Sequence, residues 1–273
     1  ADPPTLDADH SEWENVEGIT TALNSVLTRK DYTEGMSTYK CMYDDDHIYL
    51  ALEIPGDYRF NSTDNHYCAA IATMMKIGTE ATFLDMGGCP DAPVDGCAES
   101  SDIPDTCDAY RVDIGAHWEL KGTKQGVLYP INATGGTGND LVANKDDEYA
   151  VNSFCRFDDD GTDAGNEWAG AWAHTNPVDG EAGVYKFELS RLLKTKSSKT
   201  DTQMTPGETY SFGIAYWDPY EGETGWSKIG HFVTGCGTKW IDLELAKPSA
   251  GVIAIFSAAS WLTAIAAVAF NLW

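Results

Sequence analysis

A methionine, a lysine and two histidines have side chains of the kinds that bind iron. Met86 precedes two glycines, while Lys228 and His231 lie three positions apart in a stretch with loop character. A thioether is a soft ligand that favours reduced iron, whereas a lysine ligates only as the neutral amine, which requires a pKa lowered by burial. His231 is intrinsically the better iron ligand, and His117 is a further candidate. Side chains of these types ligate a metal ion only where the fold brings them together.

Each of these residues also has an ordinary structural interpretation. A lone loop methionine commonly fills a gap in a core, a lysine is commonly solvated, and His117 fits a hydrogen-bonded strand residue. Met74 and Met75 compete with Met86. Because neighbouring residues on a strand point to opposite faces, only one of that pair faces any given pocket.

The segments that must position these residues have the character of short strands. Runs rich in β-branched and aromatic residues, separated by turn residues, are typical of an all-β protein. Such runs predict strands at His47–Ile54, His66–Ile77, Tyr110–Leu120, Trp168–His174, Gly183–Leu189, Tyr210–Trp217 and Lys239–Leu245. Ser190–Lys194 is expected to add a short helical turn, while residues 78–108 and most of 121–167 are expected to be irregular. We therefore predict one antiparallel β-sandwich of the immunoglobulin type over residues 1–247.

The last part of the chain, residues 248–273, is expected to form a separate hydrophobic helix. Gly251 to Trp273 contains no charged residue and no proline. A helix of that length, at about 1.5 Å per residue, crosses the roughly 30 Å core of a bilayer. We expect a single-pass membrane anchor; a helix packed within a larger assembly and a GPI-anchor signal are the alternatives.

The charge and the cysteines narrow the class of protein. The chain has 43 Asp and Glu against 18 Lys and Arg, a net charge of −25, which argues against nucleic acid as a partner. An acidic surface suits a basic redox partner, or solubility alone. The seven cysteines form neither a CxxC zinc pattern nor a CxxCH haem-attachment site. They predict disulfides in an oxidising, extracytoplasmic compartment, after removal of a signal peptide.

Two further surface features are candidates for modification and metal binding. Asn61 and Asn132 begin Asn-x-Thr sequons and are expected glycosylation sites. The acidic runs Asp44–Asp46 and Asp158–Asp160 could bind calcium through their carboxylates, or form solvated loops.

Several segments, taken in order, resemble one known family. They are DADHSEW at 7–13, DDDHIYLALEI at 44–54, Met86-Gly-Gly, Pro93-Val94, His117-Trp118-Glu-Leu-Lys121, Ser190-Arg-Leu-Leu193 and the run from Ala215 to Lys228. Together they resemble the haem-binding domain of the ethylbenzene dehydrogenase γ-subunit and dimethyl sulfide dehydrogenase family. That domain is a β-sandwich related to family 9 carbohydrate-binding modules.

The resemblance implies a non-covalent b-type haem at one end of the sandwich. Met86 and Lys228 fall on the family's iron ligands, with His231 and His117 as alternative ligands. Trp217 would wall the pocket, together with Trp226, Trp118 and Phe83. The chain would then be an electron-transfer subunit, not an independent catalyst. Its partner would be a redox protein or a membrane electron-transfer complex.

A second hypothesis keeps the scaffold without haem. In a carbohydrate-binding module, exposed rings such as Tyr220 and Trp226 would stack on sugars. A structural subunit of a larger assembly is a third hypothesis. The sequence has no nucleophile elbow, HExxH motif or phosphate-binding loop, so it does not point to an enzyme.

Overall fold

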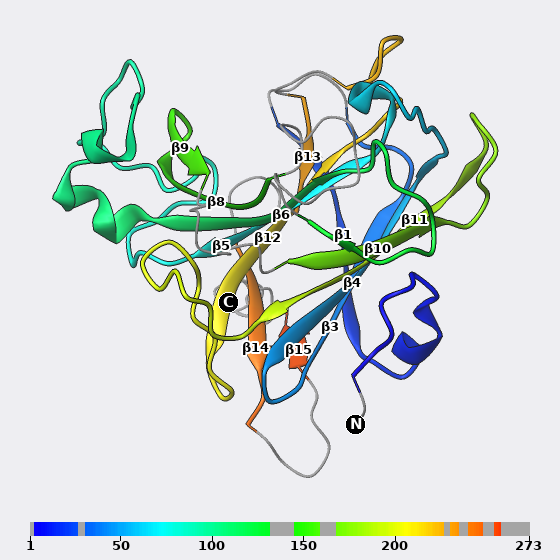
Figure 1. The fold of residues 1–273 in the computed structure, drawn as a ribbon, viewed down its shortest axis with the longest axis horizontal. Coiled ribbons are helices and arrows are strands. Elements are labelled where there is room, and N and C mark those ends of the chain that lie inside the picture. The colour runs from blue at the N-terminus through cyan, green and yellow to red at the C-terminus, as the bar shows by residue number, and fades with distance from the viewer. Residues whose placement is uncertain are drawn as a thin grey trace, which may run out of the picture.

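Two antiparallel β-sheets form the protein in a computed structural model (Figure 1), which describes residues 3–26, 31–131, 145–158, 168–226, 230–234, 240–247 and 254–257. The six-stranded sheet has the order β1-β3-β4-β11-β10-β7. Its strands are β1 (Gly18–Ala22), β3 (Met36–Tyr43), β4 (His47–Asp57), β11 (Ala182–Leu192), β10 (Ala169–His174) and β7 (Tyr129–Pro130). The all-β antiparallel class predicted from the sequence is confirmed.

The second sheet has nine strands in the order β15-β14-β12-β5-β6-β8-β9, with β13 and β2 extending from β12. They are β15 (Ala254–Ser257), β14 (Ile241–Leu245), β12 (Thr209–Trp217), β5 (Ala70–Lys76), β6 (Val112–Glu119), β8 (Lys145–Asn152), β9 (Cys155–Asp158), β13 (Phe232–Val233) and β2 (Asn24–Ser25). Short 3-10 helices lie at η1 (His10–Trp13), η2 (Asn65–Tyr67), η3 (Ser100–Asp102) and η4 (Asp105–Tyr110).

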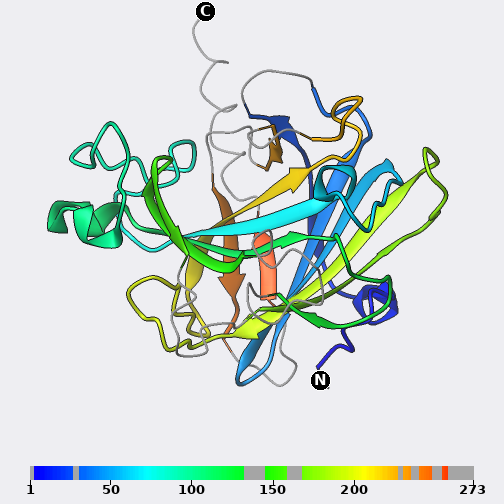
Figure 2. The same ribbon diagram turned by 45° about the horizontal axis from the view of Figure 1, so that its top comes forward.

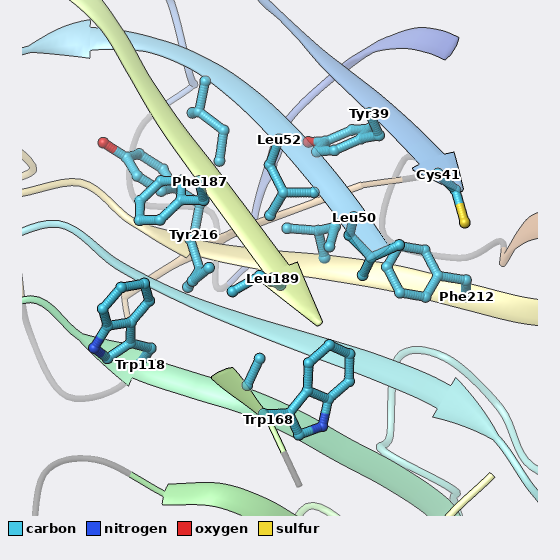
Figure 3. Packing of buried hydrophobic residues seen from close by; sticks show 14 of the residues in the cluster. Tyr39, Cys41, Leu50, Leu52, Trp118, Trp168, Phe187, Leu189, Phe212 and Tyr216 are labelled. Carbon is cyan, nitrogen blue, oxygen red and sulfur yellow. The ribbon is translucent and has the colours of Figure 1, made fainter. Parts of the chain in front are cut away.

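A large apolar core fills the space between the sheets (Figure 3). The alternation of burial along β3, from Ser37 to Tyr43, sends one side chain in two into this core, as a half-buried strand requires. From the first sheet come residues such as Tyr39, Leu50 and Phe187, and from the second Trp118, Phe212 and Tyr216.

Two local predictions were wrong. Ser190–Lys194 does not form a helical turn, because β11 continues to Leu192 along its full pairing with β4. The stretch 121–167, expected to be irregular, contains β7, β8 and β9. β8 carries the sequence KDDEYAVN, whose charges hid its strand character. Pairing with its neighbours in the sheet gives this charged segment its strand conformation.

The C-terminal prediction also needs correction. Residues 254–257, expected to belong to a helix, form β15, which pairs antiparallel with Leu245–Asp242 of β14. The short run AIFS forms the edge strand of the sheet. Apolar residues with β propensity pair readily in this way. Within the residues described here, no helix has the length and apolar character needed to cross a membrane. The other residues of the expected anchor, 248–253 and 258–273, lie outside the described residues.

A lobe formed by residues 78–110 projects from one end of the sandwich beside β9 (Figures 1 and 2). Two disulfides brace it, Cys89–Cys107 and Cys97–Cys155, so the prediction of disulfides is confirmed. Cys41 and Cys68 are free and buried, and Cys236 lies outside the described residues.

A buried ion pair joins the two sheets. Arg191 of β11 donates to Asp113 of β6, with Nη1 3.0 Å from Oδ2, and both side chains are 1% exposed. The backbone N–H of Thr202 donates to the same carboxylate oxygen at 2.8 Å, and its carbonyl accepts from Arg191. The loop after β11 is therefore held in place by hydrogen bonds to both members of this ion pair.

We predict that Arg191→Leu lowers the free energy of unfolding by about 3–5 kcal/mol, because it leaves the Asp113 carboxylate buried without its counter-charge. Adding Asp113→Asn should recover part of this loss by removing the stranded charge. Urea denaturation provides the measurement. Arg111→Leu is the control, because its partner Asp108 is 65% exposed and such pairs contribute about 1 kcal/mol or less. Equal losses in the two single variants would contradict the prediction.

Candidate functional site

A second apolar cluster covers the outer face of the nine-stranded sheet, on the side away from the core. Alternate residues of β5 and β12 turn outward into it, while their neighbours turn inward. We call it the outer-face cluster; its buried members are Ala70, Ala72, Ala81, Val112, Ile114, Ala150, Trp217 and Trp226, with Met74, Met86, Ala215 and Trp240 packed against them. Met74 lies here and Met75 in the core, so only one of the pair faces this side, as expected.

The floor of the cluster, the part made by the strands, consists largely of small residues. Ala70, Ala72 and Ala215 place only methyl groups on the sheet, and Gly213 leaves room for a ring above it. A Cβ added at Gly213 would lie 2.2 Å from Cε2 of Phe83. The small residues of the floor therefore let the ring of Phe83 lie close to the strands.

A tight loop carries Met86 over this floor. Thr82 and Gly87 exchange two backbone hydrogen bonds of 3.0 Å, which closes the loop between them. Met86 has a left-handed backbone, with φ of 48°. Non-glycine residues in that region are strained, and they concentrate at functional sites.

A bulge in β6 decides which of its residues reach the outer face. The pairing of β5 with β6 shifts by one residue between Ile71–Trp118 and Met75–Asp113. At the shift, Ala116 has φ of 47°. As a result Ile114 belongs to the outer-face cluster, while Ala116 and Trp118 belong to the core. Trp118, expected to wall the pocket, therefore lies on the wrong side of the sheet.

Three aromatic rings stack at the margin of the cluster. The ring of His117 lies 5.2 Å from that of Trp217 at 16°, and the ring of His231 lies 4.8 Å from it at 30°. Trp217 is 8% exposed. Two imidazoles are thus in contact with the indole of Trp217, the residue that the sequence resemblance places in the wall of the haem pocket.

Glu148 of β8 completes this margin and was missed by the sequence analysis. Its side chain is 1% exposed, and Oε2 lies 3.0 Å from Nδ1 of His117. Its other oxygen, Oε1, lies 3.2 Å from Nε of Arg156. The segment that contains Glu148 was expected to be irregular, so the sequence offered no reason to place this side chain beside His117.

Trp226 closes the other side of the cluster. Its Nε1 donates to the carbonyl of Cys68 at 2.7 Å, and the ring of His66 lies 4.8 Å from its own. Burial raises the pKa of the Cys68 thiol to about 12, so that this neighbour stays protonated. A hydrogen bond from His66 lowers the pKa of Asp64.

The remaining predicted site residues have separate locations. Lys228 lies outside the described residues, as do Asn132 and most of the run Asp158–Asp160. Asn61 lies in a loop, where Oδ1 accepts 2.8 Å hydrogen bonds from the N–H and hydroxyl of Thr63.

Asp44 and the tyrosine proposed for sugar stacking have structural partners. Asp44 accepts from the backbone N–H groups of Asp46 and His47, so it serves a turn. Among the described residues, no group of three or more His, Cys, Asp or Glu side chains could hold a metal ion. The guanidinium carbon of Arg59 lies 4.7 Å from the centre of the Tyr220 ring, which is a cation–π contact.

We predict that Gly87→Ala destabilises the loop that carries Met86. A Cβ at Gly87 would lie 2.3 Å from the carbonyl oxygen of Tyr110 and 2.5 Å from that of Val151, and both are backbone atoms. Gly126→Ala is the control: it has a left-handed φ of 69°, but its nearest contact would be 3.7 Å. The control should lose about 1–2 kcal/mol from left-handed strain alone. In chemical denaturation Gly87→Ala must lose clearly more than the control for the prediction to hold.

Comparisons with known proteins give a likeness of fold only. No protein-family profile and no curated protein matches the chain. A family 9 carbohydrate-binding module from Caldicellulosiruptor kristjanssonii, solved with glucose, is 12% identical with a TM-score of 0.39, covering 92% of this chain and 95% of its own. The same organism's module with cellotriose is 11% identical with a TM-score of 0.41, covering 91% and 92%. A putative carbohydrate-binding protein from Bacteroides uniformis is 11% identical with a TM-score of 0.41, covering 93% and 92%. The expected membership of the haem-binding family finds no support among these comparisons.

Proposed function

We propose that this chain is a non-catalytic binding module and that its ligand, a b-type haem, lies against the outer face of the nine-stranded sheet. The observation that carries the proposal is the position of Met86. It packs against the same apolar cluster as Trp217, although the two residues come from distant parts of the chain. A thioether beside buried indoles is an environment suited to a low-spin iron porphyrin.

The chemistry of the outer-face cluster fits such a group. Its floor of small apolar residues would suit the flat, apolar body of a porphyrin once the side chains that cover it move aside, and its methionines offer soft sulfur. When bound, the haem would supply a one-electron iron couple. The chain's own residues would hold it, exclude water and set the polarity of the iron's surroundings.

The surroundings of the site support an electron-transfer role on the exported side of a membrane. Two disulfides are typical of an oxidising compartment. The net charge of −25 suits a basic redox partner. Attachment through the apolar C-terminal segment, and glycosylation at Asn61 and Asn132, belong to the same proposal.

A carbohydrate is the second candidate ligand, favoured by the polar groups around Trp226. Asn65 donates to Glu119 at 2.6 Å, and the His66–Asp64 pair lies over the indole. Amide, carboxylate and imidazole groups beside an indole are suited to sugar hydroxyls. However, Trp226 is 5% exposed, and both Trp217 and Trp226 are in contact with imidazole rings. Stacking of either a sugar or a porphyrin on these indoles would require the imidazole rings to move.

We predict that the purified full chain binds added haemin with one equivalent and gives the sharp α and β bands of low-spin haem when reduced. Met86→Ala should abolish the low-spin bands or weaken haem binding at least tenfold, because it removes the thioether. Met36→Ala is the control, since Met36 is 53% exposed on β3 of the other sheet. Absorption spectroscopy with a pyridine haemochrome assay provides the measurement.

Calorimetry with glucose and cellotriose separates the two ligands. A chain that binds cellotriose and takes up no haemin would overturn the haem proposal and support the second candidate. Uptake of haemin that is identical in the wild type, Met86→Ala and Met36→Ala would also contradict the assigned site.

A further inference from the structure

The two most exposed large apolar side chains among the described residues lie on neighbouring turns beside the lobe. Val94 is 88% exposed and Phe154 is 71% exposed. The disulfide between Cys97 and Cys155 joins their two segments, with 4.9 Å between the Cα atoms. Single exposed apolar residues are common on soluble proteins, whereas apolar groups gathered in one place are typical of a contact surface.

Both turns have a fixed conformation that keeps these side chains outside the core. The N–H of Gly96 donates to the carbonyl of Pro93 at 3.1 Å, which closes the first turn. In the second turn, Oδ1 of Asn152 accepts from the N–H of Phe154 at 2.9 Å. A Cβ added at Gly96 would lie 3.2 Å from the carbonyl oxygen of Phe154, so the two turns are in contact. Together they form what we call the lobe tip, residues 93–96 and 152–155.

The lobe that contributes the first of these turns is strongly acidic. Residues 78–110 include eight acidic residues and no lysine or arginine, and all eight are exposed. They are Glu80, Asp85, Asp91, Asp95, Glu99, Asp102, Asp105 and Asp108. Asp95 follows Val94 directly, and Asp91 lies three residues before it. Solubility alone accounts for these carboxylates, but it does not account for an exposed phenylalanine beside them.

Apolar side chains next to carboxylates fit one class of partner. An apolar centre with a polar rim is the usual anatomy of a protein–protein interface, and aromatic residues near the centre contribute much of the affinity. A second copy of this chain would bring its own eight carboxylates to the contact, so like charges oppose self-association there. A protein whose contact surface has an apolar pocket bordered by lysine or arginine complements both features.

We propose that the lobe tip is a docking surface for such a basic protein, with Phe154 and Val94 as its apolar anchors. The carboxylates of the lobe attract the partner, and the two apolar side chains hold it in place. Two anchors bury little area, so the complex is transient and weakens as salt rises. Docking at the tip is independent of haem binding, because neither anchor belongs to the outer-face cluster.

The test uses the full chain and two labelled peptides of equal positive charge, one alternating lysine with leucine and one containing lysine alone. Fluorescence anisotropy at low salt gives their dissociation constants. Phe154→Ser should weaken binding of the lysine–leucine peptide about tenfold or more, because it removes the aromatic anchor. Val94→Ser should cause a smaller loss, and neither variant should change binding of the lysine peptide.

Val178→Ser is the matched control for the apolar anchors. Val178 is 56% exposed and lies in the loop between β10 and β11, at the opposite end of the molecule from the lobe (Figures 1 and 2). Its side chain has the same chemistry as that of Val94 but no place in the proposed interface. Binding of both peptides by Val178→Ser should therefore equal that of the wild type.

A second pair of variants tests the carboxylates. Asp91→Asn combined with Asp95→Asn should weaken binding of both peptides about two- to fivefold at low salt, and less at physiological salt, because salt screens exposed charges. Glu14→Gln combined with Glu17→Gln removes the same charge from exposed positions in the N-terminal segment and should have a smaller effect.

Three results would overturn the proposal. The first is a wild type that does not bind the lysine–leucine peptide. The second is binding that is unchanged in both Phe154→Ser and Val94→Ser, or equally weakened in Val178→Ser. The third is a dimer of the full chain, seen by sedimentation, that Phe154→Ser dissociates, because the tip would then serve a second copy of this chain. Val94→Ser keeps the test decisive if Phe154→Ser fails to fold.

Discussion

A one-residue bulge in β6 is the constraint on which both faces of the nine-stranded sheet depend. Before the bulge, Asp113 points into the core; after it, Trp118 does so and His117 points outward. A strand without the bulge would reverse one of these placements, because side chains alternate along a strand. Either the Asp113–Arg191 pair or the contact of His117 with Glu148 would be lost. The strained φ of Ala116 is the local cost of satisfying both.

The molecule therefore has two apolar regions with different roles. The inner core joins the sheets through large side chains and the buried Asp113–Arg191 pair. The floor of the outer-face cluster consists of small side chains on the sheet. Loop residues such as Phe83, Met86 and Trp226 form the layer above it. Loops on a rigid sheet are where binding residues are usually found. This division places the candidate site outside the sandwich and not between its sheets.

Loop cross-linking makes this arrangement stable. The disulfide Cys97–Cys155 joins the lobe at residues 78–110 to β9, and the N–H of Cys89 donates to the carbonyl of Val151 on β8 at 2.8 Å. Gly87 packs against the same strand, where no side chain fits. The bridge between Thr82 and Gly87 closes the loop that carries Met86. The disulfides of the lobe hold the residues that follow it, which limits the conformations that the segment can adopt.

The sequence by itself determined the strands with strong apolar character and the presence of disulfides, and it proposed Met86, Trp217 and His231 as site residues. Runs such as His47–Ile54 carry their strand signal locally, so they were predictable. The tertiary structure alone decided the charged strand β8, the strand at Ala254–Ser257, and the face to which His117 and Trp118 point. These depend on pairing with distant strands and on a bulge, and neither leaves a periodic pattern in the sequence. Glu148 became visible only when β8 placed it beside β6, because the contact joins residues whose proximity no local spacing encodes.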